Sequence, residues 1–264
     1  MEKAWVAELF ERVRKRNPLV HNITNFVAMD ISANLLLAAG ASPAMVHAEE
    51  EAADFARISD ALVINIGTLS PSWVAAMVAA ATAARDAGKP WVLDPVGVGA
   101  TAFRTATVHR LVALRPTIIR GNASEILSIA GAEGGGKGVD SRANSDSARA
   151  VAQRLAADLG TVIAVTGAVD YVTDGQRTFA IAGGHPLMTS VTAVGCAATA
   201  LVGAFVAVES DAVRAAAAAL GTLAVAGEIA AEGAAGPGSF RVRLLDTLAT
   251  LDTATLTARL RLTV

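Results

Sequence analysis

The most informative stretch for chemistry surrounds the only cysteine of the chain, Cys196. Thr192 lies four residues before it, Gly195 directly precedes it, and small apolar residues follow it. This pattern predicts a tight loop leading into a buried helix, whose first backbone N–H groups have no partner within the helix. Such a helix start attracts phosphate and lowers the pKa of a thiol placed there. A free cysteine is equally typical of a small buried core residue, so the rest of the chain must decide.

Further polar residues follow apolar segments that resemble strands. They are Asn65, Asp94, Arg120 and Thr166, with Glu125 shortly after Arg120. Asp94 and Glu125 could share a hydrated Mg²⁺, a hard cation that takes oxygen ligands. Arg120 and the helix start at Gly195 could hold phosphates, and Thr166 could donate a hydroxyl. Phosphoryl transfer requires little more than this set. Three of these residues also have a purely structural explanation: Asp94 could cap a turn, Glu125 could be a first-turn helix acid, and Thr166 could be a strand-end hydroxyl.

The segments that would position these residues alternate between apolar runs and helical patterns. Strands are expected at 42–46, 61–66, 90–93, 117–120 and 161–165, and helices at 2–16, 26–39, from 49, at 71–87 and 103–114, from 121, and at 146–158. Because the strands are apolar on both sides, this alternation predicts βαβ units around a buried parallel sheet. Ligands bind beyond the carboxyl ends of the strands in such sheets, which is where the polar residues fall.

The pattern changes after Thr166. Residues 168–173 and 177–182 flank a turn at Asp174-Gly175, which predicts a hairpin at an antiparallel edge of the sheet. Residues 131–147 are rich in glycine and polar residues and are expected to form a loop. Alanine-rich helices are expected at 197–208, 210–232 and 238–262. No repeat or linker divides the chain, so we expect a single domain over residues 1–264.

Composition excludes several classes of function. The chain has 264 residues, a net charge of −2 and an isoelectric point near 6.1, so no basic excess indicates binding to nucleic acid or to an anionic membrane. One cysteine cannot form an internal disulfide, which fits a reducing cytoplasm. The sequence is 53% hydrophobic, but its two longest apolar runs contain polar or charged residues, and the N-terminus lacks a signal-peptide pattern. We therefore expect a cytoplasmic protein that does not bind membranes.

Two common nucleotide-binding motifs do not fit the sequence. Residues 131–137 read G-x-x-x-x-G-K, but Gly138 occupies the place of the Ser or Thr that binds magnesium in a P-loop. The stretch also follows an expected helix rather than a strand. No G-x-G-x-x-G follows a first strand, so a dinucleotide-binding fold is disfavoured as well.

Five segments, in order over nearly the whole chain, resemble the hydroxyethylthiazole kinase family. They are His21-Asn22-Ile23-Thr24-Asn25, Asp94-Pro95-Val96-Gly97-Val98-Gly99-Ala100-Thr101, Arg120-Gly121-Asn122-x-x-Glu125, Gly136-Lys137-Gly138-Val139-Asp140-Ser141 and Thr192-x-x-Gly195-Cys196. The first two are specific to that family. The last is a variant of the anion-binding motif of ribokinase-like folds, which usually carries aspartate in place of Cys196. The chain also has Ala193 where the family usually has glycine.

The resemblance implies a three-layer α/β/α ribokinase-like fold and a kinase that uses ATP and Mg²⁺. Its substrate would be 4-methyl-5-(2-hydroxyethyl)thiazole, phosphorylated on the hydroxyl during thiamine salvage. The implied assignments are Asn25, Met45 and Ala193 for the substrate, Arg120, Thr166 and Gly195 for ATP, Asp94 and Glu125 for Mg²⁺, and Cys196 beside the substrate hydroxyl. The family is typically a homotrimer with active sites between subunits, so Asn25 and Met45 can belong to a neighbouring subunit.

Several alternatives remain open at this stage. The nearest are another ribokinase-like kinase, for hydroxymethylpyrimidine or a sugar, and an ADP-dependent hydrate dehydratase of the same fold. A hydrolase would use Cys196 as nucleophile with His21 or His185 as base, although no nucleophile elbow surrounds the cysteine. The last alternative is a protein that binds thiazole or nucleotide without catalysing a reaction. Within the kinase hypothesis, Cys196 is expected to position the hydroxyl and to be a modest base at most, because a thiolate of low pKa is a weak base.

Overall fold

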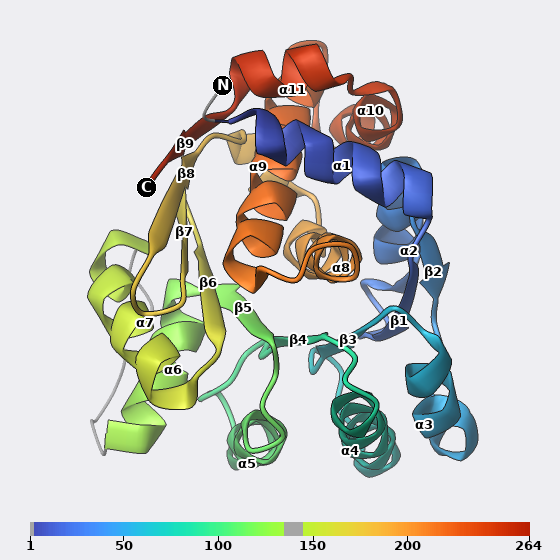
Figure 1. The fold of residues 1–264 in the computed structure, drawn as a ribbon, viewed down its shortest axis with the longest axis vertical. Helices are drawn as coiled ribbons and strands as arrows, with labels where there is room; N and C mark the ends of the chain where they lie inside the picture. Colours follow the sequence, from blue (N-terminus) through green and yellow to red (C-terminus); the bar gives the residue numbers. More distant parts are fainter. Residues whose placement is uncertain (1–2, 135–144) are drawn as a thin grey trace.

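A computed structural model describes residues 3–134 and 145–264. Within these residues, nine strands form one sheet in the order β2-β1-β3-β4-β5-β6-β7-β8-β9 (Figure 1). The strands are β1 (Leu19–Ile23), β2 (Ser42–Ala44), β3 (Ala61–Asn65), β4 (Trp91–Asp94), β5 (Ile118–Asn122), β6 (Val162–Thr166), β7 (Val169–Thr173), β8 (Thr178–Ala182) and β9 (Arg261–Thr263). Strands β1 to β6 are parallel, and β7 to β9 continue the sheet in antiparallel pairs.

Helices cover both faces of this sheet, which gives the predicted three-layer α/β/α architecture (Figure 1). One face carries α1 (Ala4–Arg16), α2 (Met29–Ala39), α8 (Val194–Val206), α9 (Ala212–Ala231), α10 (Pro237–Thr250) and α11 (Thr253–Arg259). The other carries α3 (Glu49–Ile58), α4 (Pro71–Asp86), α5 (Ala102–Val112), α6 (Ala123–Gly134) and α7 (Ser145–Leu159). Along β3, Val63 enters the first core and Leu62 and Ile64 enter the second, as expected for a strand buried on both sides.

Helix α9 is the central helix of the first face. Of the helices in the described ranges, it alone is long and apolar enough to cross a membrane by length and composition. However, 78% of its apolar window is buried inside the protein. The Asp211 carboxylate caps its start by accepting hydrogen bonds from the backbone N–H groups of Val213 and Arg214. It is therefore the buried helix that the alanine-rich pattern predicted at 210–232.

The structure corrects several expected boundaries. Strand β1 was not predicted, and the helix expected from residue 26 begins at Met29. The helix expected at 238–262 is two helices, because Asp252 caps a new helix start through the N–H of Thr255, and β9 follows. The antiparallel edge is thus a hairpin extended by the C-terminal strand.

The loop expected at 131–147 is wrong at both of its ends. Residues 131–134 belong to α6 and residues 145–147 to α7. The segment between them, which includes the family-like stretch 136–141, lies outside the described residues.

Candidate active site

The polar residues that follow the parallel strands meet at one edge of the sheet. In the register of β3 and β4, Asn65 pairs with Asp94, and in that of β5 and β6, Asn122 pairs with Thr166. The start of α8 lies over the same edge, because Thr199 of α8 donates a hydrogen bond to Asp94. The parallel order predicted from the sequence therefore brings these chemical groups together.

Asp94 is the fully buried centre of this edge. Its Oδ2 accepts hydrogen bonds from Asn65 Nδ2 and from Thr199 Oγ1, both at 2.7 Å, and Arg120 Nη1 lies 3.9 Å away. Burial raises the pKa of Asp94 to about 6, while Arg120 and the two hydrogen bonds oppose this shift and the charge of Glu125 adds to it. The other oxygen, Oδ1, is buried without a hydrogen-bond partner. A buried carboxylate oxygen in this state is suited to bind a cation or a water.

Glu125 is in the first turn of α6 and joins two loops. Its Oε1 accepts the backbone N–H of Gly97 at 3.0 Å, and its Oε2 accepts that of Asn122 at 2.8 Å. It therefore fixes the loop after β4 to the end of β5, close enough to Asp94 to influence the pKa of that carboxyl group.

Of the two carboxylates expected to hold Mg²⁺, only Asp94 has an oxygen without a partner, because both oxygens of Glu125 accept backbone N–H groups. Among the described residues, no group of three or more His, Cys, Asp or Glu side chains could hold a metal. Mg²⁺ usually keeps several waters and binds one or two carboxylates together with substrate phosphates. The unpartnered Oδ1 of Asp94 is the protein oxygen best suited to that arrangement.

Arg120 supplies the cationic side of the site. Its side chain is 12% exposed, and Nη2 donates to Thr166 Oγ1 at 2.5 Å. Its Nε is buried without a partner. A Cβ at Gly195 would lie 3.1 Å from Arg120 Nη1, so glycine at this position lets the guanidinium approach the first turn of α8. Guanidinium and free helix N–H groups together form a site of the kind that binds phosphate.

Cys196 is the third residue of α8 and is hydrogen-bonded to the carboxylate side of the site through two amides. Asn25 Nδ2 donates to Cys196 Sγ at 3.4 Å and to Asn65 Oδ1 at 2.8 Å, and Asn65 in turn donates to Asp94. Burial and the Asp94 charge raise the pKa of the Cys196 thiol. The lowered thiol pKa expected from the helix start is therefore wrong, because desolvation and a nearby negative charge both favour the neutral thiol.

Ala193 precedes α8 with a left-handed backbone, at φ 63° and ψ 13°. It is one of three residues other than glycine with positive φ among the described residues. This conformation costs an L-residue with a Cβ more than it costs glycine. Alanine at this position, where the family resemblance leads one to expect glycine, therefore adopts a backbone region that favours glycine. No side chain caps the start of α8.

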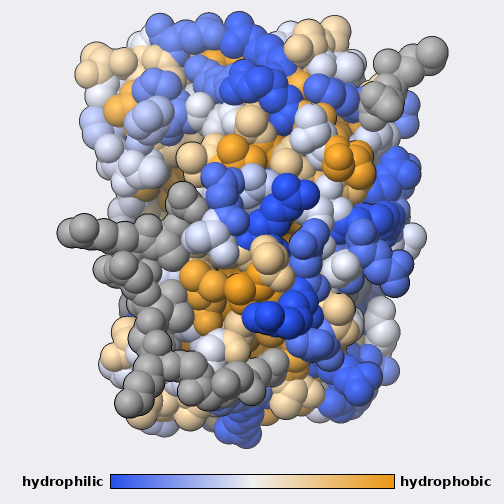
Figure 2. Space-filling view, turned by 90° about the vertical axis from the view of Figure 1, so that its left-hand side faces the viewer, coloured by the Kyte–Doolittle hydropathy of each residue, from blue (hydrophilic) through white to orange (hydrophobic). Residues whose placement is uncertain are grey.

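A cavity of about 670 Å³ leads away from this edge. Arg120, Thr166 and Gly195 line one end, and apolar side chains of α9, including Leu220 and Leu223, line a wall. On the side of the molecule that carries β7, β8 and α7, apolar surface gathers in the middle of the face between hydrophilic regions (Figure 2). The cavity combines an anion-binding end with an apolar wall, as a nucleotide site requires.

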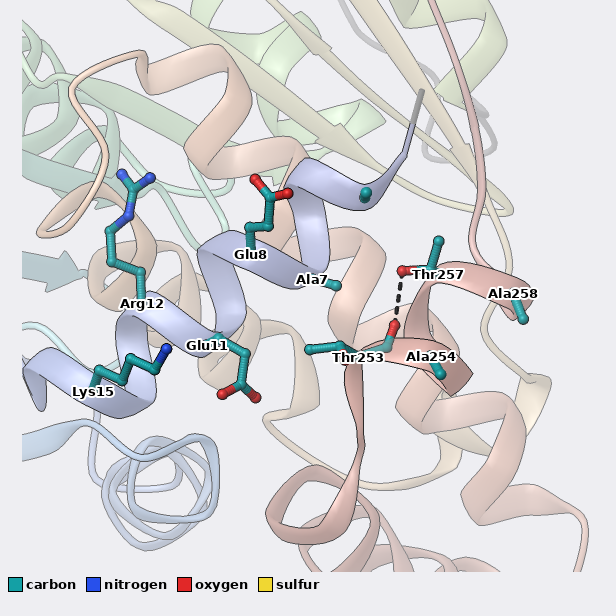
Figure 3. A pocket seen from close by; sticks show the side chains of 10 residues that line it. Ala7, Glu8, Glu11, Arg12, Lys15, Thr253, Ala254, Thr257 and Ala258 are labelled. Carbon is teal, nitrogen blue, oxygen red and sulfur yellow. Dashed lines mark hydrogen bonds between the residues drawn. The ribbon is translucent and has the colours of Figure 1, made fainter. Parts of the chain in front are cut away.

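A second hollow of about 780 Å³ lies between α1 and α11 and shares no residue with this cavity (Figure 3). It is lined by Ala4, Ala7, Glu8, Glu11, Arg12, Lys15, Thr253, Ala254, Thr257 and Ala258. Its two acids and two bases balance, and Thr257 Oγ1 donates to the carbonyl of Thr253 within α11. It contains none of the predicted site residues.

Met45 is apart from the residues described so far. It follows β2 at the outer edge of the sheet, so β1 and β3 lie between that strand and β4. Its side chain is half-buried. Of the predicted set, the structure thus places Asn25, Asp94, Arg120, Glu125, Thr166, Ala193, Gly195 and Cys196 around one edge, and Met45 toward the rim.

Three residues of the site were not assigned a role from the sequence. Asn65 was noted only as a strand end, yet it links Asn25 to Asp94. Thr199 is a fully buried hydroxyl in a helix of small apolar residues, and this contrast was the available signal. Arg104 donates to the carbonyls of Ile66, Gly67 and Val96, each at 2.8 Å, and so holds together the loops after β3 and β4. Nothing in its local sequence indicates that role.

The fold is that of the ribokinase-like class. A solved ribokinase-like superfamily protein from Enterococcus faecalis V583 shares the fold, with a TM-score of 0.66 at 13% identity over 92% of this chain and 89% of that chain. The model of the hydroxyethylthiazole kinase family matches residues 10–254, and the chain belongs to that family.

Relatives that match this chain over nearly their whole length are named hydroxyethylthiazole kinase. A hydroxyethylthiazole kinase from Rhizobium etli (strain CIAT 652) is 60% identical over 257 residues, which is 97% of this chain and 100% of that protein. The solved structure of a hydroxyethylthiazole kinase protein from Pyrococcus horikoshii OT3 is 46% identical, with a TM-score of 0.92 over 100% of this chain and 99% of that chain.

Proposed function

We propose that this enzyme transfers the terminal phosphoryl group of ATP to the hydroxyl of 4-methyl-5-(2-hydroxyethyl)thiazole, with Mg²⁺, in thiamine salvage. The observation that carries the proposal is the buried Asp94, with one unpartnered oxygen, beside Arg120 and the uncapped start of α8. Family membership supports the choice of alcohol. The free thiol of Cys196 suits the reducing cytoplasm, where we propose that the enzyme acts.

In this proposal, the phosphates of ATP lie between Arg120, Thr166 and the backbone N–H groups at the start of α8, from Ala193 to Cys196. Arg120 and these N–H groups stabilise the charge on the equatorial oxygens of the group in transfer. Asp94 and Glu125 would hold Mg²⁺, which would neutralise charge on the phosphates. Because the N–H groups are fixed by α8, they require little rearrangement during the reaction.

The substrate hydroxyl would lie beside Cys196, oriented by the hydrogen-bonded amides of Asn25 and Asn65. The raised pKa of the Cys196 thiol argues against a thiolate base. A loose transition state does not require early deprotonation of the alcohol. We therefore assign Cys196 a positioning role. We propose that the alcohol proton leaves late in the transfer and passes to an oxygen of the transferred phosphoryl group, while ADP is the leaving group.

We also propose a homotrimer in which Met45 completes the site of a neighbouring subunit, whereas Asn25 belongs to the site of its own chain, where it donates to Cys196. Three apolar side chains near Asn25 or on α2 are largely exposed in a single chain: Phe26 at 67%, Val27 at 57% and Leu37 at 60%. Burial of such side chains against a second copy would be favourable. Light scattering after size-exclusion chromatography should give three times the 26.8 kDa chain mass.

The activity is tested by ADP release from MgATP with hydroxyethylthiazole, with hydroxymethylpyrimidine and with no alcohol. We expect ADP release that depends on the thiazole alcohol and on Mg²⁺, and that is lost in Asp94→Asn. If only hydroxymethylpyrimidine is turned over, the proposed phosphate site stands, but the assignment of the thiazole alcohol as substrate is refuted. Equal ADP release without any alcohol would refute the kinase proposal.

A further inference from the structure

Asp170 lies next to the phosphate end of the cavity on the neighbouring antiparallel strand. Val165 of β6 pairs with Tyr171 of β7, so the same register sets Asp170 opposite Thr166. Side chains alternate along a strand, and Val172 enters the core beneath α9. Asp170 therefore faces the same side of the sheet as Val172, toward α9 and the cavity, whose lining includes it.

One oxygen of this carboxylate is held and the other is available. Asp170 Oδ1 accepts the backbone N–H of Gly167 at 2.9 Å, which fixes the orientation of the side chain. No hydrogen bond reaches Oδ2 from the parts of the chain that the structure describes. Burial raises the pKa of Asp170 to about 6, against the opposing effects of the Gly167 N–H and the Arg120 charge, so the group is largely ionised at neutral pH. The cavity thus contains an oriented carboxylate that can accept one more hydrogen bond.

A carboxylate is unexpected in a cavity that binds a polyanion, because like charges repel. This difficulty is resolved by the position of Asp170, which lies opposite Thr166 of the phosphate end and faces α9, whose apolar side chains line the same cavity. Arg120, Thr166 and Gly195 mark the phosphate end, and the apolar wall of α9 suits a base. The part of a nucleotide that connects phosphate to base is the ribose, whose hydroxyls donate hydrogen bonds.

We propose that Asp170 accepts a hydrogen bond from a ribose hydroxyl of the nucleotide and makes the enzyme selective for ribonucleotides over deoxyribonucleotides. The proposal rests on the proposed function, since it requires ATP to occupy this cavity. A site that hydrogen-bonds a hydroxyl rejects the analogue that lacks it, because its polar group is then left buried and unpaired.

The test is calorimetric binding of ATP, 2′-deoxy-ATP, 3′-deoxy-ATP and tripolyphosphate to the full-length protein with Mg²⁺. The variant is Asp170→Asn, whose amide oxygen can still accept the Gly167 N–H. The matched control is Asp158→Asn, which changes an exposed aspartate on α7. We expect wild-type protein and the control to bind ATP about ten-fold or more tightly than one deoxy analogue.

In Asp170→Asn this preference should shrink several-fold, with ATP bound more weakly. Tripolyphosphate should bind as tightly as before or more tightly, because a negative charge near Arg120 has been removed. If Asp170 had a purely structural role, its substitution would weaken the binding of ATP and of tripolyphosphate together. Equal binding of all three nucleotides by wild type, or an unchanged preference in Asp170→Asn, would overturn the inference while leaving the kinase assignment intact. Failure of wild type to bind any nucleotide would overturn both.

Discussion

Asn65 Nδ2 donates a hydrogen bond to Oδ2 of Asp94 at 2.7 Å, and the two residues are paired neighbours in strands β3 and β4. The same amide accepts a hydrogen bond from Asn25, which also donates to Cys196. Asn65 therefore connects the residue proposed for substrate positioning to the proposed magnesium ligand. We therefore propose that Asn65 is a positioning residue, which acts on the reaction through its neighbours.

Substitution of Asn65 by aspartate should be far more damaging than its small change in shape suggests. The change places a second carboxylate within hydrogen-bonding distance of Asp94, and two such groups share one proton rather than both ionising. We expect kcat to fall by about 100-fold, as for other displacements of catalytic groups, with weaker dependence on Mg²⁺ concentration. The control is Gln176→Glu at the exposed hairpin tip, which should leave kcat unchanged. Equal activity of Asn65→Asp and wild type would contradict the role of this contact.

The pH dependence of Cys196 follows from its surroundings. Because the pKa of the thiol is raised in the folded state, the unfolded chain loses this proton first as the pH increases. The contribution of this group to stability is therefore constant below the ordinary thiol pKa and decreases as the pH rises above about 9. Iodoacetamide should react slowly at pH 7 to 8, with a midpoint above that of a free thiol. If the midpoint of the reaction lay below the pKa of an ordinary thiol, the effect of the helix start on the Cys196 pKa would be larger than the effect of burial.

Cys196→Asp should fold and retain activity within about ten-fold of wild type, since the Asn25 amide can donate to a carboxylate as it does to sulfur. Cys196→Ala keeps the helix but loses this acceptor, and it should have lower activity than Cys196→Asp. The measurement is kcat with ATP binding followed in parallel. A folded Cys196→Asp protein that binds ATP but is completely inactive would refute the positioning role.

Ala193 offers a test of the backbone at the start of α8. Ala193→Gly removes the cost of the left-handed conformation but adds freedom to the unfolded chain, so we expect a stability change within about 1 kcal/mol. Ala193→Val places a β-branched residue where it is a genuine outlier and should lower both the melting temperature and kcat. Thermal melts and steady-state kinetics decide this. Full activity and stability in Ala193→Val would show that the left-handed backbone at this residue is not needed.

Much of the architecture could be predicted because local pattern and global fold agree. Strands such as β3 are apolar on both sides, and this property identifies a buried parallel sheet whose strand ends gather polar residues. The predicted ends of helices and strands are wrong where tertiary contacts override the local sequence pattern. Strand β1 is short and carries His21 and Asn22, and the break at Asp252 lies within a continuous helical pattern.

The site was predictable as a set of residues but not as a network. Asp94, Arg120 and Glu125 could be expected to lie close together because each follows a strand of a predicted parallel sheet. The hydrogen bonds from Asn65 and Thr199 could not, because they depend on strand register and on how α8 crosses the sheet. The pKa of Cys196 was predicted in the wrong direction, since burial and the nearness of Asp94 cannot be seen in the local sequence.

The most direct test of the account is the identity of the product formed from MgATP and hydroxyethylthiazole by the full-length protein. Mass spectrometry of the reaction, with phosphorus NMR of the purified product, should show one phosphate ester on the hydroxyethyl group. Its amount should equal the ADP released, and it should be absent with Asp94→Asn. ADP formed together with free phosphate and unmodified thiazole would contradict the account, because the site would then hydrolyse ATP rather than direct it to the alcohol.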